Sequence, residues 1–309
     1  MSLADDWRAL SRSLLGEPSL TPADVARVAR VDLEQARRLW RALGFPPVAD
    51  DDRVFTPADV ETLAAVRDLV AGGTAPEVVV QLARVIGQSL ARVAEAHVAA
   101  LSAGSTAPDV EALVPRVARL EPFLGYVWRR HLVAALFRTS AAHAASEGTR
   151  MVVGFADLVG FTEIAAQLGS AELSAFVERF EAHAYERIPA FGGRIVKTIG
   201  DEVMFAVADG QSAARIALAL VAAYAADAML PDVRVGLASG PTVAYEGDLF
   251  GSTVNLASRL VALAHPGTVL VSDELGEELA GDPAFALRRL RPRLKGLGRV
   301  RAWVLRAND

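Results

Sequence analysis

Two aspartates stand where short apolar segments end. Asp157 lies in the segment FADLVGFT and Asp201 in the segment KTIGDEVMF. Neighbouring strands run roughly 5 Å apart, so two such carboxylates can reach a pair of Mg²⁺ ions about 4 Å from each other. Two Mg²⁺ ions held in this way can also bind a triphosphate. The two aspartates therefore predict a metal site that handles a nucleotide, although Asp201 alone is equally explained as an exposed carboxylate in a Gly-Asp turn.

A lysine and an aspartate are two further candidate residues. Lys197 precedes Asp201 by four residues and lies among Ile195, Val196 and Ile199. A charge among apolar side chains needs a partner, although a lysine in a strand is often a solvated edge residue. Asp248, seven residues before Asn255, is a further candidate carboxylate.

Three further polar residues complete the set. Asn255 and Arg259 are four residues apart in STVNLASRL and would share one face of a helix. From that face, a short amide and a long guanidinium can orient a sugar and reach a phosphate together. Lys295 lies in RLKGLGR, where flanking glycines let the backbone approach a ligand. The alternative interpretation of Arg259 is an ordinary surface arginine, and that of Lys295 is an exposed basic strand edge.

The elements that position these residues follow a β-α-β-β-α-β order, typical of a ferredoxin-like unit. Gly200-Asp201 should form a tight turn between two of the strands. The predicted strands cover 152–157, 193–199, 202–208 and 232–238, and the predicted helices cover 170–188 and 211–228. Further elements up to Leu305 should include a helix over 253–264, a strand over 268–272 and a helix over 273–280.

The first half of the chain predicts helices throughout. Thr21-Pro22 and Thr56-Pro57 are helix-start signals, and Gly44 and Gly72-Gly73 are stops. One long helical stretch over 76–101 and two more over 110–143 should follow. We therefore predict an α+β protein with an all-α domain over 1–148 and a ferredoxin-like domain over 149–309.

Composition narrows the functional classes. The 309 residues include no cysteine, which fits a reducing compartment, and the N-terminus has no signal-peptide pattern. The longest uncharged apolar run, Ile216–Ala226, is too short to span a bilayer, so we expect a cytoplasmic protein. Net charge is −5 and neither half is basic, which argues against a dedicated nucleic-acid surface.

From about Met151 to Leu305 the chain resembles the catalytic domain of class III nucleotidyl cyclases. Four segments carry the resemblance in the family's order: FADLVGFT, KTIGDEVMF, GDLFGSTVNLASRL and LKGLG. The resemblance implies an adenylate cyclase that converts ATP to 3′,5′-cyclic AMP and pyrophosphate with two Mg²⁺ or Mn²⁺ ions per active site. It also implies that Asp157, Asp201 and the backbone carbonyl of Leu158 bind the metal.

The same resemblance implies roles for the other residues. Lys197 and Asp248 would read adenine, because a donor and an acceptor match its N1 and N6 atoms, whereas guanine reverses that pattern. Asn255 would position the ribose, and Arg259 would stabilise charge on the α-phosphate. Lys295 would grip the triphosphate. Guanylate cyclase activity is the alternative that this set of residues leaves open.

The resemblance also implies a homodimer. Asp157 and Asp201 of one subunit would face Lys197, Asp248, Asn255, Arg259 and Lys295 of the other across a two-fold axis. The segment between Pro241 and Asp248, where the family builds a dimerisation arm, is shorter than in many relatives. Phosphate-binding residues that longer arms supply are therefore in doubt here.

Residues 21–73 distantly resemble the helix-turn-helix of MerR-type regulators. Arg37, Arg38 and Arg41 could reach phosphates, but Asp32 and Glu34 lie close by and oppose a DNA backbone. We therefore favour a regulatory module over a DNA-binding one. The alternative is a DNA-binding regulator whose cyclase domain senses nucleotides without turnover. A small molecule, a lipid chain and pH are all open as regulatory signals, the last through the following histidines: His97, His131 and His143.

Overall fold

The computed structural model describes residues 3–102, 110–144, 150–294 and 298–308. The chain forms two compact units, Met1–Arg138 and Thr139–Asp309. The domain boundary predicted near residue 148 lies outside the described residues and stays a prediction. The described residues contain no helix that could span a lipid bilayer.

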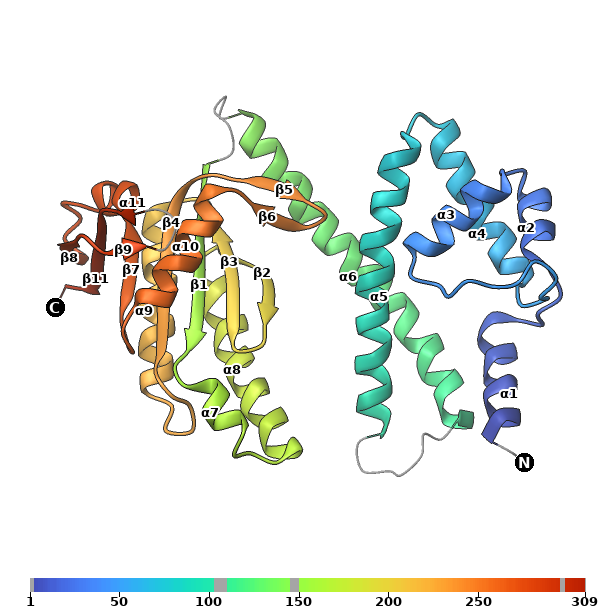
Figure 1. Ribbon diagram of the computed structural model, residues 1–309, viewed down its shortest axis with the longest axis horizontal. Helices are drawn as coiled ribbons and strands as arrows, with labels where there is room; N and C mark the ends of the chain where they lie inside the picture. Colours follow the sequence, from blue (N-terminus) through green and yellow to red (C-terminus); the bar gives the residue numbers. More distant parts are fainter. Residues whose placement is uncertain (1–2, 103–109, 145–149, 295–297, 309) are drawn as a thin grey trace. The chain divides into compact units, whose positions relative to one another are not determined.

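The first unit is helical, as predicted. Its helices are α1 (Leu3–Leu15), α2 (Pro22–Ala29), α3 (Leu33–Ala42), α4 (Pro57–Ala71), α5 (Pro76–Ser102) and most of α6 (Val110–Ala144) (Figure 1). The prediction of two separate helices over 110–143 was wrong, because α6 is continuous. It continues through Pro115 and Pro122, each of which removes only one backbone hydrogen bond from a helix of 35 residues.

The two Thr-Pro signals begin helices by the expected chemistry. Thr21 and Thr56 cap α2 and α4, and each exchanges hydrogen bonds with an aspartate three residues later. Trp40 stacks on Phe55 with ring centroids 4.5 Å apart in the core of this unit. Arg37 pairs with Asp50 and Glu34, so acidic neighbours occupy one of the arginines considered for DNA contact.

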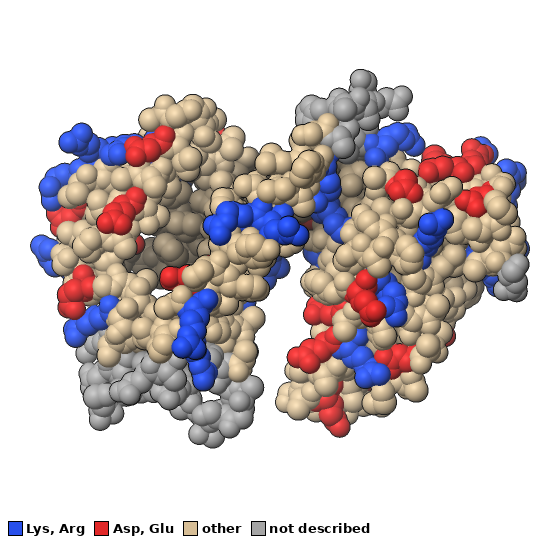
Figure 2. Space-filling model, turned by 180° about the vertical axis from the view of Figure 1, so that it is seen from behind, with Lys and Arg blue, Asp and Glu red and all other residues tan. Residues whose placement is uncertain are grey.

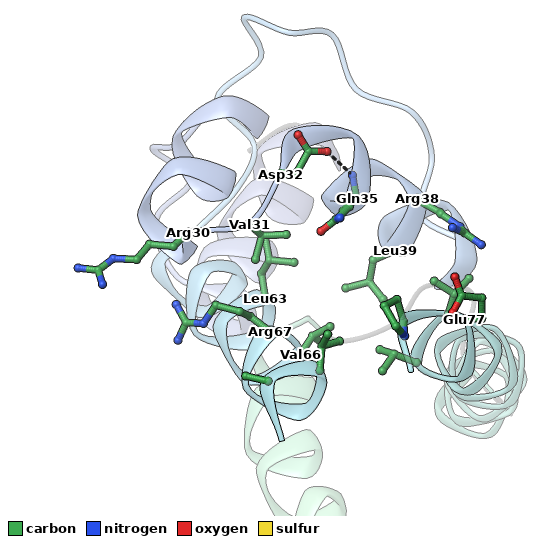
Figure 3. Close-up of a pocket in the computed structure, with 15 residues that line it drawn as sticks. Arg30, Val31, Asp32, Gln35, Arg38, Leu39, Leu63, Val66, Arg67 and Glu77 are labelled. Atoms are coloured by element: carbon green, nitrogen blue, oxygen red, sulfur yellow. Dashed lines mark hydrogen bonds between the residues drawn. The ribbon is translucent and has the colours of Figure 1, made fainter. Parts of the chain in front are cut away.

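A cavity of about 480 Å³ lies between α3, α4 and the start of α5 (Figure 3). Its wall is largely apolar and includes Leu39, Leu63 and Val66. Several charged residues also line it: Arg30, Asp32, Arg38, Arg67 and Glu77. The helical unit therefore has room for a ligand of moderate size with an apolar part.

The second unit is built on a seven-stranded sheet in the order β2-β3-β1-β4-β7-β11-β8. Its strands are β1 (Arg150–Leu158), β2 (Arg194–Ile199), β3 (Glu202–Val207), β4 (Val233–Pro241), β7 (Val269–Ser272), β8 (Phe285–Leu290) and β11 (Ala302–Ala307). All neighbours are antiparallel except β4 and β7. The first four strands confirm the predicted ferredoxin-like unit.

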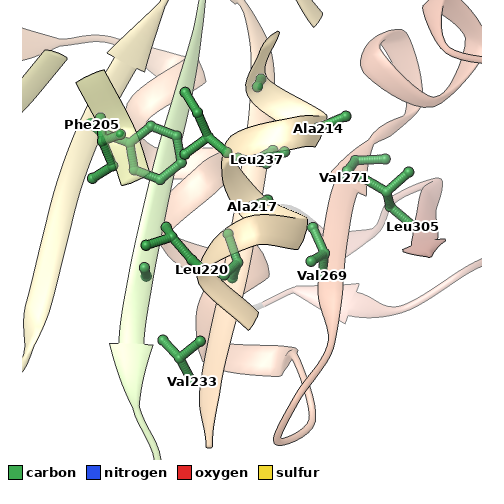
Figure 4. Packing of buried hydrophobic residues seen from close by; sticks show 14 of the residues in the cluster. Phe205, Ala214, Ala217, Leu220, Val233, Leu237, Val269, Val271 and Leu305 are labelled. Atoms are coloured by element: carbon green, nitrogen blue, oxygen red, sulfur yellow. The ribbon is translucent and has the colours of Figure 1, made fainter. Parts of the chain in front are cut away.

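Helices cover both faces of this sheet. They are α7 (Phe161–Ala165), α8 (Ser170–Ala190), α9 (Gly210–Ala225), α10 (Ser252–Leu263) and α11 (Asp273–Glu278). The main core contains residues of α8 and α9, with Phe205, Leu220 and Leu237 among its members (Figure 4). On the opposite face, Ala257 and Val261 of α10 pack with Phe155. Helix α10, which contains the candidate residues Asn255 and Arg259, is thus held against the central strands.

Two short hairpins lie outside the main sheet. One joins β5 (Val243–Tyr245) to β6 (Asp248–Phe250), and the other joins β9 (Arg293–Leu294) to β10 (Gly298–Arg299). The β5–β6 hairpin was not predicted, and it contains the candidate residue Asp248 at the start of β6. Tyr245 and Phe250 touch edge to face on it and are both exposed.

Candidate active site

The two candidate metal ligands lie at the same end of the sheet. Asp157 is the penultimate residue of β1, and Asp201 lies in the two-residue turn between β2 and β3. Gly200 has φ +63°, which lets the chain reverse within that turn. The Leu158 N–H donates to the Asp201 carbonyl at 3.2 Å, so the turn is attached directly to the end of β1.

Asp157 lies between opposite charges on its neighbouring strands. It is paired in register with Glu202 of β3 on one side and with Arg234 of β4 on the other. Arg234 donates from Nε to Asp157 Oδ2 at 2.7 Å, and its Nη2 lies 2.6 Å from the same oxygen. Sequence reasoning missed both neighbours. A charged residue within the apolar segment VRVGLASG was the signal that could have indicated Arg234.

This end of the sheet has a surplus of carboxylates. Burial, followed by the charges of Asp157 and Asp201, raises the pKa of Glu202 to about 7. Burial also raises the pKa of Asp201, and the charge of Asp157 adds to that effect. Arg234 is the cation in contact with Asp157, and the charges of Arg234 and Lys197 only partly offset the rise in the pKa of Glu202. The cluster is an environment that further positive charge would stabilise.

The donor chemistry at this end fits a hard divalent cation. Carboxylate and carbonyl oxygens are the ligands of Mg²⁺, and Mg²⁺ sites usually combine one or two carboxylates with water and substrate phosphates. Among the described residues, no three His, Cys, Asp or Glu side chains converge to hold an ion. An ion bound by Asp157 and Asp201 would therefore need backbone, water and substrate oxygens to complete its coordination.

The structure brings Lys197 and Asp248 together. The Lys197 ammonium donates to Asp248 Oδ2, which links strand β2 to the β5–β6 hairpin. The other oxygen, Asp248 Oδ1, accepts from the Leu249 N–H at 2.8 Å and holds the carboxylate in place. Both side chains remain partly exposed, at 38% for Lys197 and 25% for Asp248, so a ligand could reach them.

The remaining candidates lie elsewhere in this unit. Asn255 and Arg259 are one turn apart on α10, and their spacing places them opposite the buried residues Ala257 and Val261. Asn255 is exposed and Arg259 is half-buried. They are on a different element from the carboxylate end of β1. Lys295 lies outside the described residues, so its proposed role is untouched by the structure.

Comparison with known families assigns both halves of the chain. Residues 144–307 match the adenylate and guanylate cyclase catalytic domain, and residues 4–139 match the adenylate cyclase regulatory domain. The chain therefore belongs to the family of nucleotidyl cyclases that join these two domains. The prediction that the chain is a class III cyclase with a helical regulatory domain is confirmed. These matches do not support the resemblance to MerR-type regulators.

Several curated proteins are similar over nearly the whole chain. An adenylate cyclase of Streptomyces coelicolor is 39% identical over 95% of this chain and 87% of its own length. An adenylate cyclase of Streptomyces griseus is 40% identical over 84% of this chain and 68% of its own length. A pH-sensitive adenylate cyclase of Mycobacterium tuberculosis is 34% identical, covering 88% of this chain and 74% of that protein.

Proposed function

We propose that this chain is an adenylate cyclase that closes ATP to 3′,5′-cyclic AMP and releases pyrophosphate. The observation that carries the proposal is the pairing of Lys197 with Asp248 in the same domain as the Asp157–Asp201 end of the sheet. The first arrangement suits an adenine edge and the second suits a metal-bound triphosphate. The names of the similar Streptomyces proteins agree with this activity.

Metal binding falls to Asp157, Asp201 and the carbonyl of Leu158. When bound, two Mg²⁺ or Mn²⁺ ions supply activation of the ribose 3′-hydroxyl and neutralisation of charge on the triphosphate. The protein's part is to hold two carboxylates at a fixed separation. The hydrogen bond from Leu158 to Asp201 supports this role, because it ties the turn to the strand.

Base selection falls to the lysine–aspartate pair. Lys197 donates a hydrogen bond to adenine N1, and Asp248 accepts one from the N6 amino group. Guanine presents a donor and an acceptor in the reverse order and would leave both side chains mispaired. A site built to bond one edge discriminates strongly against the other.

Residues of α10 and the following segment act on the rest of the nucleotide. Asn255 positions the ribose so that its 3′-hydroxyl is in line with the α-phosphate. Arg259 stabilises the charge that develops on the α-phosphoryl oxygens, and Lys295 grips the triphosphate. Asn255 and Arg259 share one face of α10, with Asn255 exposed and Arg259 half-buried, which supports their acting on one ligand.

A homodimer would complete each site. Asp157 and Asp201 of one subunit and the base-reading and α10 residues of the other would enclose one nucleotide, giving two equivalent sites. The placement of the α10 residues supports this reading, because their spacing puts Asn255 and Arg259 opposite the buried residues Ala257 and Val261, which pack on the sheet. A single chain should then be almost inactive.

The helical unit would regulate the pair of catalytic domains. Because each site straddles the dimer interface, a small rotation of one catalytic domain separates its two halves. The cavity lined by Leu39, Leu63 and Val66 offers a place for an effector with an apolar part (Figure 3). The name of the mycobacterial relative supports keeping pH among the candidate signals.

Acidic and basic side chains are interspersed on both units on the face shown in Figure 2.

The test is a direct assay of the full chain with ATP and GTP in parallel. We expect cyclic AMP and pyrophosphate from ATP with Mg²⁺ or Mn²⁺, and no product from an Asp157→Ala or Asp201→Ala variant that still dimerises. Preferential formation of cyclic GMP would establish the guanylate cyclase alternative. Absence of any product, with nucleotide-dependent binding to DNA in a mobility-shift assay, would favour the regulator alternative.

A further inference from the structure

Arg234 occupies one oxygen of a carboxylate that the proposed metal site needs. Its Nε and Nη2 atoms lie 2.7 and 2.6 Å from Asp157 Oδ2, and both side chains are partly buried. Its third nitrogen, Nη1, makes only a long contact of 3.4 Å with the Ala262 carbonyl. Asp157 is thus the strongest partner of this guanidinium among the described contacts.

A guanidinium and a divalent cation compete for the same oxygen. Two N–H groups already approach Oδ2, and the positive charge of Arg234 repels a second cation at short range. Asp201, in the turn attached to the end of β1, and Glu202, opposite Asp157 in register, place further carboxyl groups at this end of the sheet. The site can therefore attract a metal ion as a whole, while Arg234 occupies one oxygen, Oδ2, of one of its two carboxylate ligands.

We propose that Arg234 is a positioning residue that makes metal binding depend on the arrival of a triphosphate. This inference rests on the proposed function. Without nucleotide, Arg234 holds Asp157 Oδ2 and weakens metal binding. A triphosphate beside Asp157 gives the planar guanidinium a second anion that it can bind with two parallel hydrogen bonds. Asp157 is then released to the metal, and by linkage the nucleotide and the metal strengthen each other's binding.

The test measures metal binding without nucleotide, so it does not depend on turnover. Mn²⁺ is titrated into the full chain and free Mn²⁺ is followed by electron paramagnetic resonance. We expect Arg234→Ala to lower the Kd for Mn²⁺ by at least about tenfold, because a nearby positive charge is removed. Arg234→Lys keeps the charge but loses the fork, and should fall between the two. Arg306→Ala, on β11 of the same sheet, is the matched control and should leave the Kd unchanged.

Two outcomes would overturn the inference. One is Mn²⁺ binding by Arg234→Ala that is equal to or weaker than that of the wild type, with an unchanged circular dichroism spectrum. The other, should Arg234→Ala not fold, is Arg234→Lys binding Mn²⁺ no more tightly than the wild type. If either result accompanied normal ATP turnover by the wild type, only the role of Arg234 would be lost and the proposed cyclase activity would stand.

Discussion

At the scale of single residues, the candidate site contains two groups of charged side chains. Asp157 and Asp201 lie at the end of the central sheet with Glu202 and Arg234, where burial shifts protonation. Lys197 and Asp248 form a partly exposed pair at the edge of the sheet and on a hairpin. The first group should determine whether the reaction occurs, and the second should determine which nucleotide enters.

Replacing Lys197 should weaken base selection more than catalysis. Lys197→Met removes the donor to adenine N1 and leaves Asp248 without its ion-pair partner. We expect the ratio of kcat/KM for ATP to that for GTP to fall by at least about tenfold, since each mispaired polar group at a specific site costs a factor of that order or more. Steady-state kinetics with both nucleotides measure the ratio. Arg187→Met on α8 should leave it unchanged, and an unaltered ratio in Lys197→Met would exclude the base-reading role.

Glu202 should give the metal-free protein a stability that falls as pH rises. Its pKa of about 7 in the folded chain exceeds the ordinary value of 4.5, so the folded state holds a proton that the unfolded state has lost between these values. The contribution of Glu202 to stability is therefore greatest below about pH 4.5 and declines as pH rises towards 7. Melting temperatures should be measured in the presence of a chelator between about pH 4.5 and 7. As pH rises, they should decline less for Glu202→Gln than for the wild type. Parallel curves for the two proteins would contradict the assignment.

At the scale of elements, close backbone packing fixes α10 on the sheet. Gly236 of β4 faces this helix, and a Cβ atom there would lie 2.3 Å from Val261 N and 2.5 Å from Ala257 O. Backbone atoms cannot rotate away from such a contact. The absence of a side chain at Gly236 therefore sets the distance between α10 and the sheet, and with it the positions of Asn255 and Arg259.

Gly236→Ala should impair activity without touching the substrate. Because α10 must move outward, we expect destabilisation of about 1–3 kcal/mol, typical of overpacking. Turnover should fall by on the order of 100-fold, since small misplacements of positioning groups are costly. Denaturant unfolding and kcat measurements check both effects. Gly169→Ala is the matched control, because its Cβ would meet Glu172 at an ordinary 3.5 Å. Full activity in Gly236→Ala would show that α10 is not placed by this contact.

The main elements could be predicted because their signals are local. Apolar runs that stop at glycines gave the strands, and Gly200-Asp201 was expected as the turn that the structure contains. Helix α7 is only five residues long, too short to show a helical period. The β5–β6 hairpin is largely exposed, so it lacks the alternation of a half-buried strand.

Parts of the site were beyond sequence reasoning for a different reason. Arg234 meets Asp157 across the β1–β4 pairing, although the two residues are 77 positions apart. Nothing local in either segment specifies that register. The Lys197–Asp248 pair was suggested by resemblance, and its contact spans 51 positions. Long-range pairing of strands thus decides which charges meet, and residue spacing alone does not.

At the scale of the whole molecule, shared sites would make two defective chains complementary. A heterodimer of Asp157→Ala and Asn255→Ala has one site with both defects and one with none. Random exchange of subunits makes half of the dimers heterodimers, so an equal mixture should recover about a quarter of wild-type activity. Assays of each variant alone and of the mixture after subunit exchange measure this. A mixture as inactive as its components would count against sites shared between subunits.

The position of Lys197 on the outermost strand has an evolutionary consequence. Strand β2 ends the sheet, and Asp248 lies on a hairpin beyond it, so neither residue belongs to the buried clusters that stabilise the fold. Substitutions at these two positions carry little risk of unfolding the domain. Preference for one purine over the other can therefore drift between descendants of this chain, while the aspartate on the central strand β1 is constrained from both sides.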